Sequence, residues 1–215
     1  AISMTCDRIM QCKHIVSVVP YKVKAEAIYK TEDYRELFSK VKSYGIPFTI
    51  HAGEADGPDN IKSAISFGAK RIGHGVKCIE DLDLINTLID NNITLEVCPT
   101  SNIQTCICDS YNNHPINELV KKGVKVTINT DNMTVSNTNL SNEYNNLIKN
   151  TNITIENIIN MNINSINAAF ISNMEKQELY DKLVEFCKKE YIEDISFDFL
   201  CKFLDLYSPF SRKTL

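Results

Sequence analysis

The stretch Phe48-Thr49-Ile50-His51-Ala52-Gly53-Glu54 decides the fold of this chain, because it runs from an apolar segment directly into a histidine and a glutamate. Residues 46–50 have the composition of a short buried strand, and they follow a helix-like segment that stops at Gly45. Strands that end in chemically active side chains are typical of parallel α/β proteins, where such residues collect at the carboxyl ends of the strands.

The same pattern occurs three more times along the chain. Strand-like segments run into Gly73-His74-Gly75, Cys98-Pro99-Thr100-Ser101-Asn102 and Asn129-Thr130-Asp131-Asn132. Apolar spacing predicts helices over 34–44, 58–67, 80–90 and 115–122, and strands over 46–50, 70–72, 93–98 and 124–129. A strand and a helix in each roughly 30 residues is the repeat of a TIM-type (β/α)8 barrel. We therefore predict a parallel α/β fold of that type.

The two ends of the chain extend this prediction. Residues 2–6 and 14–19 have the pattern of two earlier strands, and 140–149, 154–170 and 173–189 have the pattern of helices. We therefore expect an incomplete barrel with about six of its strands, followed by extra C-terminal helices. The many asparagines of 154–170 leave the helical spacing of apolar residues intact, and we interpret them as background composition. Since no Gly, Ser or Pro-rich linker interrupts the chain, residues 1–215 are predicted to form a single domain.

The composition narrows the class of protein. The chain has 215 residues, 43% of them hydrophobic, and a formal charge of -4, and its Lys and Arg residues form no stripe, so we expect neither a nucleic-acid nor a membrane partner. No apolar run approaches the roughly 20 residues of a membrane span, and the start lacks a signal-peptide pattern.

Because the eight cysteines include no C-x-x-C pair, Cys106-Ile107-Cys108 is not interpreted as a metal site. Unpaired thiols in a core-rich chain predict a reducing, cytoplasmic location. Four cysteines are interpreted as small buried hydrophobes: Cys6, Cys12, Cys78 and Cys187.

Four polar side chains at strand ends are the candidates for chemistry: His51, Glu54, His74 and Asp131. Taken singly, a strand-end histidine is more often an ordinary hydrogen-bonded residue than a ligand, and Asp131 can be a metal ligand or a helix N-cap. Three nearby residues, Thr134, Ser136 and Ser141, offer other caps. Together, nitrogen and oxygen donors without thiolate suit a zinc ion that activates water. Cys98 is interpreted as a packing residue, and the turn at 99–102 as a wall of the site.

These motifs resemble the adenosine deaminase family. The resemblance extends in the same order and spacing from about Glu26 to Leu183, and its segments are 48–56, 70–75, 95–102, 128–132 and 162–170. It implies a zinc-containing eight-stranded barrel that deaminates adenosine hydrolytically to inosine and ammonia, a reaction of purine salvage. The implied partner is a small purine nucleoside.

The resemblance also implies roles for single residues. His51 and Asp131 would be zinc ligands, and Glu54 would be the acid that protonates the purine nitrogen N1. His74 would orient the attacking water and stabilise the charge that develops. Asn132 stands where many members have a second aspartate that bonds purine N7, and an amide can donate a hydrogen bond to that acceptor directly.

The chain departs from the family pattern in two places. The family takes its other two zinc ligands from a His-x-His motif on the first strand, and this chain contains no such motif. By the same pattern the chain begins near the third strand, so two protein ligands would hold zinc weakly. Lys24, in the segment 21–24, stands where the family has a glycine that holds the substrate ring. His14 and His114 are interpreted as structural residues.

Three functions therefore stay open at the level of sequence. The chain can belong to an adenosine deaminase, to a truncated and catalytically inactive relative, or to a deaminase of adenine or of a modified adenosine. The motifs do not separate these possibilities.

Overall fold

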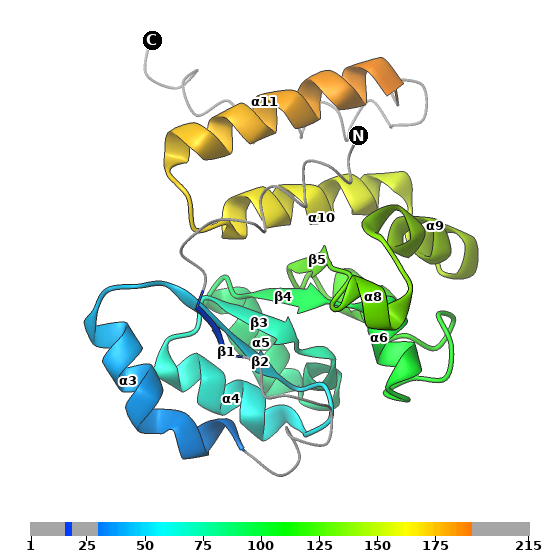
Figure 1. The fold of residues 1–215 in the computed structure, drawn as a ribbon. Helices are drawn as coiled ribbons and strands as arrows, with labels where there is room; N and C mark the ends of the chain where they lie inside the picture. Colours follow the sequence, from blue (N-terminus) through cyan, green and yellow to red (C-terminus); the bar gives the residue numbers. More distant parts are fainter. Residues whose placement is uncertain (1–15, 19–29, 191–215) are drawn as a thin grey trace.

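A five-stranded parallel sheet forms the centre of the molecule (Figure 1). The structure is a computed structural model that describes residues 16–18 and 30–190. The strands are β1 (Val16–Val18), β2 (Phe48–Ala52), β3 (Arg71–His74), β4 (Thr94–Val97) and β5 (Val126–Ile128). They lie side by side in chain order, and every neighbouring pair is parallel. Parallel neighbours require crossover connections, so this order confirms the predicted α/β organisation.

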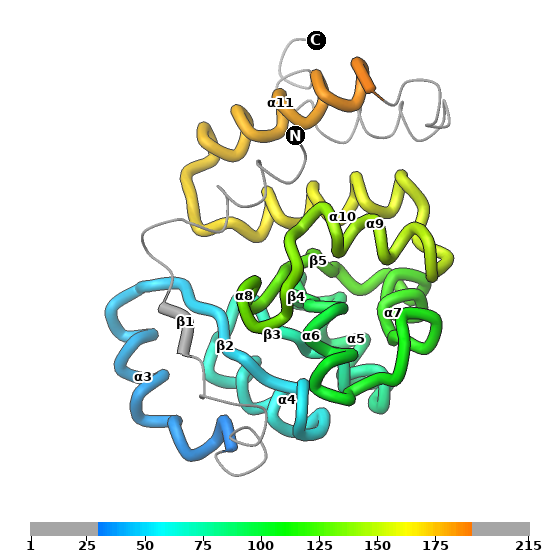
Figure 2. Tube along the Cα trace, turned by 45° about the vertical axis from the view of Figure 1, so that its right-hand side comes forward, coloured from blue at the N-terminus to red at the C-terminus, as the bar shows by residue number. Residues whose placement is uncertain are grey.

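Helices connect the strands and cover the sheet. They are η1 (Thr31–Tyr34), α3 (Arg35–Ser43), α4 (Pro58–Phe67), η2 (Val76–Glu80), α5 (Leu82–Asp90), α6 (Pro99–Gln104), α7 (Ile116–Lys121), α8 (Met133–Ser136), α9 (Leu140–Asn150), α10 (Ile155–Ala168) and α11 (Asn173–Glu190). In both views of the fold α10 lies beyond β5, and α11 lies on the far side of α10 (Figure 1 and Figure 2). The described strands therefore form an arc of an α/β barrel, with α10 and α11 stacked at the β5 side.

The structure corrects several boundaries. Strand β2 continues through Ala52, so His51 lies within the strand and not after it. The segment 99–102, predicted as a turn, is the start of helix α6, and the short helix α8 was not predicted. The predicted strand over 14–19 is described only at Val16–Val18. The predicted strand 2–6, His14, the segment 21–24, Cys6 and Cys12 all lie outside the described residues.

The two faces of the sheet differ in polarity. Successive strand residues point to opposite faces, and the register pairs Thr49 with Arg71 and His51 with Gly73. The alternate positions carry the buried apolar side chains Phe48, Ile50, Ala52, Ile72, Leu95, Val97, Val126 and Ile128. These residues pack with apolar side chains of the covering helices in one large core. The opposite, polar face is therefore the one from which His51 projects.

An ion pair lies on the polar face. The Nε of Arg71 is 2.9 Å from Oε1 of Glu96, whose other oxygen accepts a 2.8 Å hydrogen bond from Thr49 Oγ1. The Arg71 guanidinium also donates to the Ala168 carbonyl at 3.3 Å and lies 4.0 Å from the centre of the Phe170 ring. The pair thus joins three strands to the end of α10.

Helix α10 is buried against both of its neighbours. Ile158 and Met161 belong to the core against the sheet, whereas Ile159 and Ile163 belong to a second apolar cluster shared with α11. Its asparagines are more than background composition: Asn164 Nδ2, for example, donates to the Val126 carbonyl of β5 at 3.0 Å. A buried amide needs a hydrogen-bond partner within the protein, and Asn162 has one too, because its Nδ2 donates to the Ile158 carbonyl at 2.8 Å.

Two expectations from composition can be compared with the described residues. No helix in 16–18 and 30–190 is long and apolar enough to span a membrane. The five cysteines in these ranges, Cys78, Cys98, Cys106, Cys108 and Cys187, are all free thiols. Cys78 and Cys187 are buried as predicted. The cytoplasmic location stays a prediction.

The turn after β2 depends on Gly53, which has a φ of +73° and whose added Cβ would lie 2.3 Å from Ile61 Cδ1. We expect Gly53→Ala to lower the free energy of unfolding by about 2–4 kcal/mol through combined strain and overlap. The control is Gly45→Ala, with a φ of +68° and no atom within 4 Å, which carries only the strain of about 1 kcal/mol. Urea denaturation measures both, and equal losses would show that the contact with Ile61 is not the constraint.

Candidate metal and catalytic site

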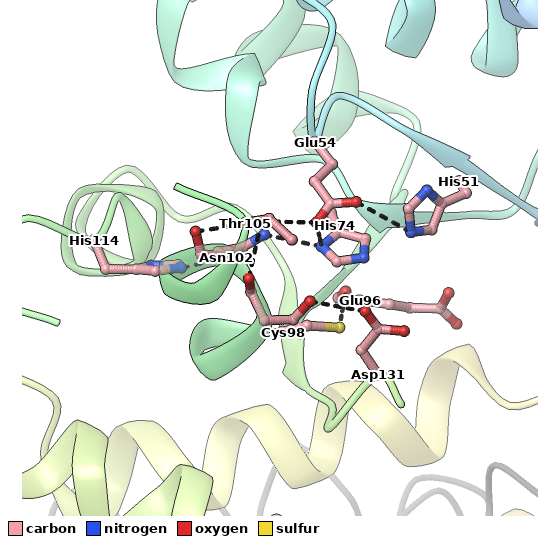
Figure 3. Close-up of polar contacts among 10 residues, drawn as sticks. His51, Glu54, His74, Glu96, Cys98, Asn102, Thr105, His114 and Asp131 are labelled. Atoms are coloured by element: carbon pink, nitrogen blue, oxygen red, sulfur yellow. Dashed lines mark hydrogen bonds and ion pairs between the residues drawn. The ribbon is translucent and has the colours of Figure 1, made fainter. Parts of the chain in front are cut away.

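Three of the predicted residues meet at the carboxyl ends of β2 and β3. Nε2 of His51 lies 3.7 Å from one carboxylate oxygen of Glu54, and Nδ1 of His74 lies 3.6 Å from the other. The two imidazole rings meet edge to face with their centres 4.2 Å apart. One donor atom from each residue lies within 4.8 Å of the others, which is close enough for a shared ion (Figure 3). The expected convergence of these strand ends is confirmed for these three residues.

Glycines make the close approach of the two histidines possible. Gly73 is paired with His51 across the sheet, and a Cβ added to it would lie 3.0 Å from Cδ2 of the His51 ring. His74 has a φ of +58°, a left-handed conformation that is uncommon outside glycine. The next residue, Gly75, also has positive φ, and its added Cβ would lie 2.6 Å from Leu95. The chain therefore turns sharply at His74, as strained residues at functional sites often do.

The site is largely shielded from water. Glu54 is 3% exposed and His74 1% exposed. Burial, followed by the nearby His51 and His114, lowers the pKa of His74 well below its ordinary value. Since desolvation disfavours the charged form, His74 is a neutral imidazole at pH 7.

Helix α6 and its C-cap residue contact Asp131, His74 and Glu54. Ser101 Oγ donates to Asp131 Oδ2 at 2.8 Å, and Asn102 Nδ2 lies 2.9 Å from His74 Nδ1. The hydroxyl of Thr105, the C-cap residue, lies 3.2 Å from Glu54 Oε1. The segment interpreted as a passive wall is therefore the support of the site.

Helix α6 is itself held by a buried carboxylate. Glu143 of α9 has no exposed surface, and its oxygens accept hydrogen bonds from Thr100 N at 3.1 Å and Thr138 Oγ1 at 2.7 Å. A negative charge at a helix N-terminus is stabilised by the exposed N–H groups there. Pro99 at the first helical position was a signal for this helix in the sequence. No local signal pointed to Glu143.

Asp131 and Asn132 lie in the loop after β5. Asp131 is exposed, has a φ of +54°, and is not among the three residues grouped above. It does not cap a helix: the N-cap of α8 is Asn132, whose Oδ1 accepts from Thr134 N and Val135 N. Figure 3 shows the Asp131 carboxylate beside the His51–His74 pair. The alternative role of Asp131 as a cap is thus wrong.

His114 is a structural residue with a direct connection to the site. It is 3% exposed, its Nδ1 accepts from Ile116 N at 3.1 Å, and its Nε2 lies 3.2 Å from Asn102 Oδ1. Burial lowers its pKa to about 4. The sequence analysis interpreted His114 as a structural residue and missed its connection to His74 through Asn102.

The available donor atoms fit a borderline metal ion such as zinc. His51 and the carboxylates supply nitrogen and oxygen, while Cys98 is buried and its Sγ donates to the Glu96 carbonyl at 3.5 Å. Burial, together with Asp131 and other carboxylates, raises the pKa of the Cys98 thiol well above its usual value. A protonated thiol is not a metal ligand, so the packing role predicted for Cys98 agrees with its surroundings.

The parallel strands and the histidine–carboxylate group at their carboxyl ends define a protein of the α/β-barrel class with a candidate metal site. Residues 22–186 match the family model of adenosine deaminase, which is more than half of the chain. The chain therefore belongs to the adenosine deaminase family.

Curated relatives agree with this assignment. The chain is 42% identical to an adenosine deaminase from Haemophilus ducreyi over 155 residues, which are 72% of this chain and 45% of the relative. It is 44% identical to one from Clostridium botulinum over 156 residues, which are 71% of this chain and 46% of the relative. The chain thus spans about half the length of the curated relatives that it matches.

Solved structures share the fold. An adenine deaminase from Arthrobacter aurescens superposes with a TM-score of 0.75 at 24% identity, covering 87% of this chain and 57% of that one. A zinc-bound amidohydrolase from Burkholderia ambifaria superposes with a TM-score of 0.70 at 18% identity, covering 88% of this chain and 56% of that one. At these identities the likeness establishes the barrel fold alone.

The low pKa of His114 predicts loss of stability in acid. Its pKa falls from about 6.5 in the unfolded chain to about 4 in the folded one, so unfolding takes up a proton between these values. Above pH 6.5 the ring is neutral in both states and does not change the free energy of unfolding. As the pH falls to 4, the ring is protonated mainly in the unfolded chain, and the free energy of unfolding falls by about 3 kcal/mol. Urea denaturation of the wild type and of His114→Gln at both pH values isolates this residue from the carboxylates. A wild-type pH dependence no steeper than that of the variant would contradict the assignment.

Proposed function

We propose that the protein to which this chain belongs deaminates adenosine hydrolytically with the help of a zinc ion. The observation that carries the proposal is the meeting of His51, Glu54 and His74 at the carboxyl ends of neighbouring parallel strands. The adenosine deaminases to which the chain is about 40% identical support the same reaction. The N6-methyl-AMP and adenine deaminases share only the fold at 24% identity or less, so adenosine is the substrate that we favour.

His51 and Asp131 are the residues that would hold the zinc ion. His51 supplies a ring nitrogen and Asp131 supplies carboxylate oxygens, which are atoms that zinc binds. Ser101 orients the Asp131 carboxylate through a hydrogen bond to one of its oxygens. When bound, zinc lowers the pKa of water to roughly 7, so a nucleophile is available at neutral pH.

The chemistry requires one proton donor and one group that orients water. The water oxygen bonds to C6 of the purine, and the bond from C6 to the amino nitrogen breaks. One proton of the water goes to the amino group, which leaves as ammonia, and the other replaces the proton that N1 receives from the acid. Glu54 in its acid form would protonate N1, which quenches the negative charge that develops in the ring. His74, which is neutral and buried beside Glu54, would hold the water in position to attack C6.

Asn132 would bind N7 of the purine. Its Oδ1 already accepts two backbone hydrogen bonds as the N-cap of α8, so the side chain is held with its amide NH2 available as a donor. Purine N7 is an acceptor, and an amide donates to it at any pH.

Glu54→Gln tests the proton donor. The amide has the same shape, but it cannot transfer a proton, so we expect ammonia release from adenosine to fall at least about 100-fold. Zinc content, measured by elemental analysis, should be unchanged. The control is Glu118→Gln on α7, whose side chain is 57% exposed and pairs with Lys122. An active Glu54→Gln variant would refute the role of Glu54.

The same assay separates the candidate functions. Adenosine, adenine and N6-methyl-AMP are compared as substrates with zinc present, and adenosine should give the highest kcat/KM. Adenosine and adenine would release ammonia, whereas N6-methyl-AMP would release methylamine, so both amines are measured. Wild-type protein that binds zinc and releases neither amine would be an inactive relative of the family.

Asn132→Ser tests the contact with N7. Ser is as good an N-cap as Asn, so α8 should be preserved, whereas its shorter side chain has no amide to donate to N7. We expect KM for adenosine to rise about tenfold, the effect of about 1.4 kcal/mol, with a smaller change in kcat. The matched control is Asn139→Ser, at the exposed N-cap of α9. If both variants keep the wild-type KM, Asn132 does not contact the substrate.

A further inference from the structure

We propose that the backbone N–H of Ile116, acting through His114 and Asn102, holds His74 in the tautomer that carries its proton on Nε2. His114 and Asn102 are then positioning residues of the site, although neither one belongs to the metal or substrate ligands proposed above. The tautomer is a property of the chain itself, and only its catalytic consequence rests on the proposed function.

The direction of the chain of hydrogen bonds is set at its start. A backbone N–H can only donate, and Ile116 N lies 3.1 Å from Nδ1 of His114. Nδ1 must therefore be the unprotonated nitrogen of the neutral ring, and Nε2 carries the proton. The Nε2–H then donates across 3.2 Å to Oδ1 of Asn102.

Asn102 passes this direction to His74. With its oxygen occupied by His114, the amide presents its NH2 to the other side, where Nδ2 lies 2.9 Å from Nδ1 of His74. Nδ1 of His74 therefore accepts, and its proton is on Nε2.

The opposite orientation of Asn102 is excluded by the ends of the chain. A turned amide would place its NH2 against Nε2 of His114, which would force the His114 proton onto Nδ1, directly against the Ile116 N–H. The low pKa of His114 keeps the ring from carrying both protons at pH 7.

Among the described residues, the neighbouring carboxylate of Glu54 does not compete for these atoms. Glu54 Oε1 is 3.6 Å from His74 Nδ1, which is too long for a hydrogen bond. Asn102 has no exposed surface, and His74 and His114 are 1% and 3% exposed, so bulk water does not reach the chain. Buried polar chains of this kind hold one arrangement because an unmatched donor or acceptor is costly there.

The consequence concerns how His74 takes part in the reaction. Figure 3 shows its second ring nitrogen facing the space bordered by His51 and Asp131. With the proton on that nitrogen, neutral His74 offers a hydrogen bond to the attacking water or to the charge that develops. Because Nε2 already carries a proton in this tautomer, it cannot accept another proton from the water.

The test is 15N NMR of the chain labelled at its four histidines. In the wild type at pH 7, Nδ1 of His74 and of His114 should both give pyridine-type signals, and Nε2 of each should give a pyrrole-type signal with a bound proton. His74→Gln and His114→Gln assign the signals. A proton on Nδ1 of either ring in the wild type would overturn the proposal without any further variant.

Asn102→Asp tests the transmission. The carboxylate has the same shape and still accepts from His114, but it cannot donate to His74, so the His74 proton should move to Nδ1. The signal of His74 Nδ1 should change from pyridine-type to pyrrole-type, whereas Asn139→Asp, an exposed N-cap, should leave it unchanged. An unchanged His74 signal in Asn102→Asp would refute the role of Asn102.

Kinetics address the catalytic consequence separately. In the active protein, Asn102→Asp should lower kcat for adenosine by at least about 100-fold, as wrong tautomers do elsewhere, with little change in KM. A moved proton with an unchanged kcat would keep the tautomer assignment and overturn its catalytic role. A wild type without deaminase activity would refute the proposed function and leave the NMR result standing.

Discussion

The parallel register of β2 and β3 is the constraint on which the rest of the site depends. It places His51 opposite Gly73, the one strand position there without a side chain, and brings His74 to the end of the neighbouring strand. A Cβ at position 73 would already press on the His51 ring. Because parallel strands present their carboxyl ends at one edge, the loop that carries Glu54 completes the group without further rearrangement.

A second layer of structure turns this meeting of side chains into a defined geometry. Helix α6 contacts Asp131, His74 and, through its C-cap residue Thr105, Glu54. The helix is fixed by the buried carboxylate of Glu143 on α9. A single short helix and its C-cap residue therefore hold side chains that come from strands far apart in the sequence. Positioning of this kind is what a reaction at C6 of a purine requires, since small displacements of catalytic groups are costly.

The buried residues around the site include paired polar groups. Arg71 and Glu96 lie on the polar face of the sheet, and His114 and Asn102 lie behind His74. Such groups contribute little net stability compared with apolar residues of the same size, but once buried they allow few alternative arrangements. The fold therefore draws its stability from the apolar face of the sheet, and the geometry of the site from the polar side.

The amino-acid sequence by itself determined the types and order of the elements and the residues that end the strands. Hydrophobic periodicity reports which face of a segment is buried, so β2 to β5, the helices that follow them, and the meeting of His51, Glu54 and His74 were predicted before the structure. Helix α6 was missed because Pro99 was interpreted as the end of a strand and not as the first residue of a helix. Only the tertiary structure decided that Asn102 contacts His74, 28 residues away, that Asn132 and not Asp131 caps α8, and that Glu143 holds α6. The physical reason is that hydrogen bonds between distant side chains depend on distances and directions that no local pattern records.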